Sequence, residues 1–93
     1  MASVTATVPT TNGSKYMQQL CKHWSHKLEV EFDTENARVT FPEAVATMAA
    51  APEALTVTIE AADAEQVERM KGVVSSHLDR FAFREAPLPF DWQ

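Results

Sequence analysis

Residues 28–41 of the chain, LEVEFDTENARVTF, decide the fold because apolar and polar side chains alternate on both sides of a short polar stretch. Leu28, Val30 and Phe32 alternate with acidic residues, which is the period of a strand with one buried face. The polar stretch DTEN has the composition of a turn, and ARVTF then repeats the alternation. The pattern predicts an antiparallel hairpin.

Three more strands are predicted around this hairpin. Residues 3–8 and 55–60 alternate apolar with polar side chains in the same way. Residues 44–50 are a less distinct strand, because their alanines also suit a helix. Turn signals such as Pro9 and Pro52 separate these segments from their neighbours.

Two segments have the period of a helix. From about Lys15 the apolar residues recur at helical spacing and share one face, with Tyr16 at its edge, in a segment that runs into residues 22–27. The second segment ends near Phe81. Asp63 is placed to cap it, with Gln66 three residues later as in a capping box.

These elements predict one α+β domain over residues 1–93, with the order β-α-β-β-β-β-α and an extended C-terminal tail. Short turns between successive strands require a single antiparallel sheet of four to five strands, with two helices covering one face. The class is that of TATA-binding-protein-like or helix-grip-like folds, with no implication of DNA binding. The tail, residues 83–93, is apolar enough that Phe90 and Trp92 should pack on the domain or on a partner.

Composition excludes several classes of function. The net charge of −5 argues against nucleic-acid binding, which depends on an excess of Lys and Arg. No apolar run approaches the roughly 18 residues that cross a membrane. The N-terminus lacks the features of a secretory signal, and the single Cys21 cannot form an internal disulfide. We therefore expect a cytoplasmic protein.

Residues 22–27, KHWSHK, form the first cluster with chemical potential. On a helical wheel Trp24 turns into the core, His23 lies at the margin of the apolar face with Lys27, and His26 lies on the far side. Two histidines three residues apart can share a metal in principle, but no other motif supplies the missing ligands. Cationic side chains at a helix C-terminus are the simpler interpretation. We expect no metal and no cofactor.

The second cluster is HLDRFAFRE, residues 77–85. His77 falls close to the centre of the apolar stripe of the second predicted helix, where a neutral, hydrogen-bonded core histidine is the common outcome. Arg80 and Arg84 compensate the helix dipole or form salt bridges, or alternatively hold an anionic ligand. No nucleophile motif or glycine-rich phosphate loop is present, so no catalytic residue is predicted.

Several motifs together resemble a known bacterial family. They are GSKY at 13–16, QLCKHWSHK at 19–27, EAAD at 60–63, HLDRFAFRE at 77–85 and DW at 91–92, and the chain resembles domain of unknown function 2218. Some relatives are attached to, or encoded near, siderophore-interacting flavin-dependent ferric reductases. The resemblance therefore implies an accessory role in iron-siderophore handling, and it supplies no catalytic residues.

Three hypotheses for function remain open. The first is a non-catalytic domain that binds an anionic small ligand or a siderophore-interacting flavoprotein. The second is a small enzyme with His23 and His77 as an acid-base pair. The third is a structural domain that forms a homodimer through its tail. The candidate surface for the first comprises His23, His26, Lys27, His77, Arg80 and Arg84.

Overall fold

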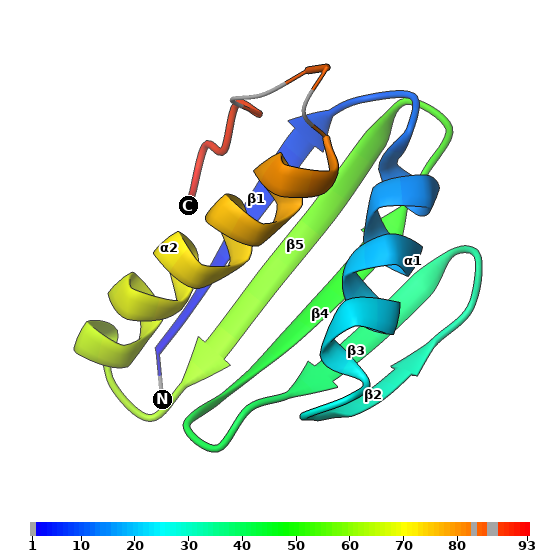
Figure 1. Cartoon of the computed structure of the whole chain (residues 1–93). Helices are drawn as coiled ribbons and strands as arrows, with labels where there is room; N and C mark the ends of the chain where they lie inside the picture. The colour runs from blue at the N-terminus through cyan, green and yellow to red at the C-terminus, as the bar shows by residue number, and fades with distance from the viewer. Residues whose placement is uncertain (1, 83, 86–87) are drawn as a thin grey trace.

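The computed structural model describes residues 2–82, 84–85 and 88–93 (Figure 1). Its elements follow the predicted order, β-α-β-β-β-β-α. They are β1 (Ala2–Pro9), α1 (Gly13–Trp24), β2 (Glu29–Phe32), β3 (Asn36–Thr40), β4 (Ala44–Ala50), β5 (Ala54–Ala61) and α2 (Ala64–Phe81).

The strands form one five-stranded antiparallel sheet in the order β1-β5-β4-β3-β2. The predicted hairpin is confirmed as β2 and β3, where Glu31 faces Arg38 across the strands. Its turn is closed by the Asp33 carboxylate, which accepts 2.8 Å hydrogen bonds from the backbone N–H groups of Glu35 and Asn36.

The alanine-rich segment is a strand, as predicted, and it occupies the centre of the sheet as β4. It pairs with β3 on one side and β5 on the other, so both edges of its backbone are bonded. Ala46 and Met48 on its inner side are buried. Pairing on both sides therefore overrides the preference of alanine for helix.

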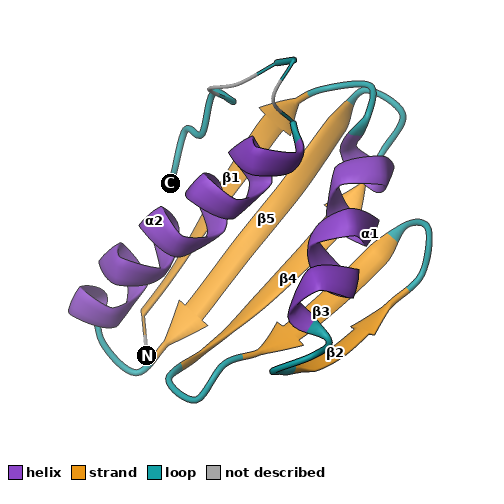
Figure 2. Cartoon of the chain, in the orientation of Figure 1, coloured by secondary structure: helices purple, strands orange, loops and turns teal. Residues whose placement is uncertain are grey.

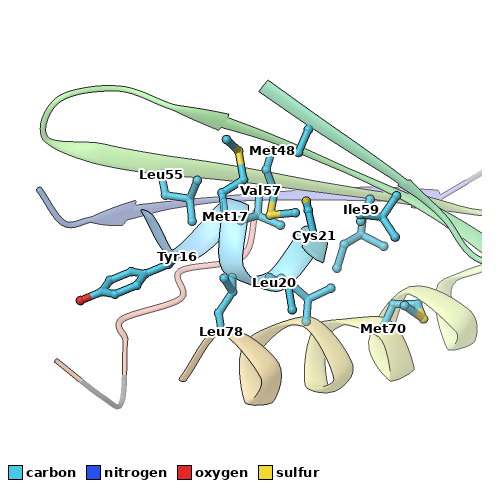
Figure 3. Close-up of a cluster of buried hydrophobic side chains, with 14 of the residues drawn as sticks. Tyr16, Met17, Leu20, Cys21, Met48, Leu55, Val57, Ile59, Met70 and Leu78 are labelled. Atoms are coloured by element: carbon cyan, nitrogen blue, oxygen red, sulfur yellow. The ribbon is translucent and has the colours of Figure 1, made fainter. Parts of the chain in front are cut away.

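Both helices lie on the same face of the sheet, which confirms the predicted class (Figure 2). The core fills the space between the helices and the sheet. It consists of the inward side chains of the strands and the apolar stripes of the helices. Figure 3 shows this packing, in which Met17 and Cys21 of α1 lie toward Val57 and Ile59 of β5. Leu20 lies on the side of α1 that is turned toward α2.

Helix α1 begins where the chain passes very close to β5. A Cβ added to Gly13 would lie 3.0 Å from the Cβ of Leu55, so the absence of a side chain permits this approach. The helix ends at Trp24, which is buried as predicted, and residues 25–27 form a turn. His26 and Lys27 therefore lie beyond the helix and not on its last turn.

Helix α2 begins at the predicted cap. The Asp63 carboxylate accepts a 2.9 Å hydrogen bond from the backbone N–H of Gln66. The reciprocal half of a capping box is missing within the described chain, since the Gln66 side-chain oxygen is buried without a hydrogen-bond partner. The cap thus depends on Asp63.

The described part of the tail returns along α2 and β1. The backbone N–H of Leu88 donates to the Asp79 carboxylate at 3.0 Å, and Leu88 is buried. Gln93 and Thr5 exchange two backbone hydrogen bonds of 2.8 and 2.9 Å. The rings of Phe90 and Trp92 stack 5.4 Å apart and pack at the margin of the core. Phe83 of the predicted tail lies outside the described residues.

Across the described residues, neither helix has the length and apolar character that a membrane crossing requires.

Candidate functional site

The two clusters singled out in the sequence meet in space, at the seam where α1 packs against α2. The ring centroids of His23 and His77 are 6.0 Å apart, with the ring planes inclined by 40°. Phe81 lies 6.0 Å from His23, and Trp24 lies 5.2 Å from His77. Two imidazoles and the rings of Trp24 and Phe81 therefore form an aromatic cluster where the two helices meet.

The two histidines have different surroundings. His23 is exposed, at the margin of the apolar face of α1 as predicted. His77 is half-buried at the edge of the core and not at the centre of the buried stripe of α2. Its Nδ1 lies 2.7 Å from the carbonyl oxygen of Val73, one turn earlier in the helix. A carbonyl only accepts, so Nδ1 donates this bond and the ring is held in one orientation.

At the other end of the seam, the Glu85 carboxylate accepts hydrogen bonds from three side chains. The Thr10 hydroxyl lies 3.0 and 3.1 Å from its two oxygens, and the Asn12 amide donates at 3.2 Å. The Tyr16 hydroxyl donates to the same group. In Figure 3 the Tyr16 ring leaves the core with its oxygen outermost. Glu85 thus joins the end of α2 to the loop and helix that follow β1.

Ionisation of this cluster follows from its hydrogen bonds. The bond from Tyr16, followed by that from Asn12, lowers the pKa of Glu85 below its ordinary value. The same bond, together with burial of the ring, raises the pKa of Tyr16. Helix α1 has no acidic residue in its own first turn. The ionised Glu85 therefore supplies negative charge near a helix N-terminus that lacks it.

A hollow of about 320 Å³ opens beside this cluster. Lys15 and Arg84 provide positive charge in its walls, and Phe81 provides an apolar surface. Because Phe81 also contacts His23, the hollow and the histidine pair form one continuous region along the seam. The lining consists of Asn12, Lys15, Tyr16, Phe81, Arg84 and Glu85.

Charge is distributed unevenly over the molecule. Residues 13–27 and 77–85 contain five of the eight Lys and Arg residues and all three histidines, but only two of the thirteen carboxylates. Both of these carboxylates accept hydrogen bonds from their own chain, Asp79 from Leu88 and Glu85 from its three donors. The two segments that form the seam are therefore cationic parts of an acidic chain.

Not every residue of the candidate surface is in contact with the histidine pair. His23 and His77 are in contact, and Arg84 lines the adjoining hollow. Arg80 is exposed near the end of α2, and His26 and Lys27 are exposed in the turn after α1. Among the described residues, no hydrogen bond, ion pair or ring contact joins these three to the histidine pair.

Four residues of the seam were missed by the sequence analysis: Thr10, Asn12, Tyr16 and Glu85. Tyr16 is the last residue of the motif GSKY, and Glu85 is the last residue of HLDRFAFRE. Their place in these motifs is the signal by which the sequence could have identified them. Helical periodicity placed Tyr16 at the edge of the apolar face but carries no information about a partner 69 residues away.

Metal-ligating groups are sparse. Within the described residues, no group of three or more His, Cys, Asp or Glu side chains is arranged to hold a metal ion. Cys21 is fully buried, and desolvation raises the pKa of its thiol to about 11. It is therefore a core residue and not a ligand.

Comparison with known proteins gives two matches. A family model described as an uncharacterised protein conserved in bacteria matches residues 5–93. The NMR structure of PA4090 from Pseudomonas aeruginosa is similar, with a TM-score of 0.85 and 32% sequence identity. The match covers 100% of this chain and 96% of that one. No curated protein matches the chain.

Proposed function

The chain belongs to the bacterial family named domain of unknown function 2218, and we propose that it is a small cytoplasmic, non-catalytic binding domain. Its binding surface is the seam between α1 and α2, and its ligand is an anionic small molecule or the acidic face of a partner protein. One observation carries the proposal: the cationic segments 13–27 and 77–85 lie side by side, with both of their carboxylates already hydrogen-bonded internally.

The chemistry of the seam suits an anion that also carries a ring or another apolar group. Lys15 and Arg84 flank the hollow, and Phe81 offers a face on which such a group can pack. Positive charge attracts the anion, while the apolar contact contributes favourable binding free energy that salt does not screen. The carboxylates elsewhere on the chain disfavour anions at other surfaces.

The family resemblance suggests which anion to test first. Relatives associated with flavin-dependent ferric reductases make an iron-siderophore complex, or the acidic face of such a flavoprotein, the natural candidate. Titration calorimetry of the chain with ferric siderophores and with the cognate reductase tests both. If neither binds while circular dichroism shows an intact fold, the proposed function is wrong.

A matched pair of variants in one helix tests the surface. Arg80→Ser removes a charge beside the seam, and we expect about twofold to fivefold weaker binding. Arg69→Ser removes another exposed charge from the first half of α2, where it pairs with Glu43 at 3.5 Å. This control variant should bind like the wild type. Equal losses of affinity in the two variants would mean that binding depends on the net charge of the protein and not on this surface.

Acid-base catalysis by His23 and His77 is a second candidate, which their 6.0 Å separation favours. The hollow beside the seam is lined by other residues and not by His23 or His77, so catalysis on a substrate bound there would need access from the hollow to the histidines. A binding function needs no such access, and we therefore rank it first.

A further inference from the structure

The hydrogen bond of His77 determines which of its ring nitrogens is available. Nδ1 donates its proton to the Val73 carbonyl at 2.7 Å, so in the neutral ring Nε2 carries a free lone pair. Histidines that bind metals very often donate their second ring N–H to a backbone carbonyl in this way, which orients the ring and makes the ligating nitrogen more basic.

His23 supplies a second imidazole from the opposite helix. Two imidazoles bound to one tetrahedral zinc ion, at about 2.0–2.1 Å each, place their ring centroids roughly 5–6 Å apart. The observed separation of 6.0 Å is close to this geometry. His23 is exposed, so a small rotation of its side chain can adjust the distance, whereas His77 is held by Val73 and packed against Trp24.

We propose that His23 and His77 form a two-histidine site for a divalent transition metal of the zinc, nickel and copper class. Imidazole nitrogens suit these borderline ions, whereas magnesium and calcium prefer oxygen ligands. With no third chelating side chain among the described residues, the remaining coordination positions belong to water or to a ligand from outside. The surrounding Lys and Arg residues favour an anion there.

This inference goes beyond the proposed function and does not depend on it. The metal contacts neutral ring nitrogens, while the proposed anion contacts Lys and Arg side chains. A metal held at the seam would add one coordination bond to an anion that also reaches Arg84. The two proposals can therefore fail separately: Arg80→Ser should weaken anion binding only, and loss of His23 should weaken metal binding.

The three histidines of the chain provide the test and its control. The full chain without an affinity tag is titrated with zinc chloride at pH 7.5, by calorimetry and by NMR of the imidazole resonances. We expect one equivalent to bind in the wild type and to raise the melting temperature. His23→Gln and His77→Gln should each weaken binding by more than the roughly 10–100-fold that loss of an outer-shell partner costs.

His26→Gln is the matched control, because His26 is exposed in the turn after α1 and, among the described residues, makes no ring contact with the pair. It should bind zinc like the wild type, and magnesium chloride should bind to none of the variants.

Since His23 is exposed, His23→Gln keeps the fold even if His77→Gln does not. The proposal is overturned if wild-type chain binds no zinc, if His23→Gln binds it unchanged, or if His26→Gln loses as much affinity as His23→Gln.

Discussion

The Tyr16 hydroxyl donates a hydrogen bond to the Glu85 carboxylate and thereby joins α1 to the segment that follows α2. Thr10 and Asn12 donate to the same carboxylate from the loop before α1. One acidic side chain therefore fixes how the two helix ends meet and shapes the hollow beside them. The stability of this arrangement can be tested directly.

Replacing Glu85 by Gln should destabilise the protein at neutral pH. The amide keeps one acceptor oxygen but adds two N–H donors that face three existing donors, and it removes the charge near the N-terminus of α1. Urea unfolding should show a lower midpoint than in the wild type. Glu60→Gln, an exposed residue of β5, is the control and should unfold like the wild type. Tyr16→Phe should cost about 1 kcal/mol.

Stability should depend on pH through the same pair. Because the pKa of Glu85 is lowered, its contribution is present above the unfolded value of 4.5 and is lost as the pH falls through the folded pKa. The pKa of Tyr16 is raised above 10.0, so its contribution is present below pH 10 and is lost as the pH rises through the folded pKa.

Urea unfolding at acidic, neutral and alkaline pH tests the expected loss of stability at both ends of the pH range. The wild type and Glu85→Gln should converge in stability at acidic pH and differ most near neutrality. The carboxylate of Asp33, whose pKa is lowered by the backbone N–H groups of Glu35 and Asn36, titrates in both proteins and cancels in the difference. A difference independent of pH would contradict this account.

Replacing each of the two glycines by alanine should change the stability of the protein in opposite directions. A Cβ on Gly72 would meet nothing within 4 Å, so Gly72→Ala should stabilise the protein by about 1 kcal/mol through helix propensity. A Cβ on Gly13 would lie 3.0 Å from the Cβ of Leu55, which is buried and attached directly to the backbone of β5. Gly13→Ala should therefore destabilise, as thermal unfolding can show.

The thiol of Cys21 should be unreactive in the folded protein. It is fully buried, and burial raises its pKa to about 11. At pH 8 only about one thiol in a thousand would then be ionised. A thiol reagent such as dithionitrobenzoate should react slowly without urea and faster as the protein unfolds. Rapid stoichiometric reaction of the native protein would show that α1 opens readily.

Trp92 should contribute to the stability of its own chain and not to an oligomer. It stacks on Phe90, and Gln93 beside it pairs with Thr5 of β1. Trp92→Ala should cost about 1 kcal/mol or more in unfolding free energy. Sedimentation velocity should give the same mass for the variant and the wild type. A dimer that dissociates in Trp92→Ala would instead support the homodimer hypothesis.

The elements with local causes were predictable from the sequence. The alternation on both sides of DTEN identified the hairpin, because strand period and turn chemistry act over a few residues. The cap at Asp63 was identified for the same reason, since it bonds a residue only three positions later. The end of α1 at Trp24 was less clear, because KHWSHK contains no residue that stops a helix.

What the sequence determined by itself is the order of elements, the antiparallel sheet with helices on one face, and the burial of residues such as Trp24. These follow from periodicity and hydrophobicity, which each segment carries alone. Only the tertiary structure decided that His23 faces His77 and that Tyr16 bonds Glu85. Such contacts depend on how two helices pack over a sheet, and residues more than fifty positions apart contain no local signal of that geometry.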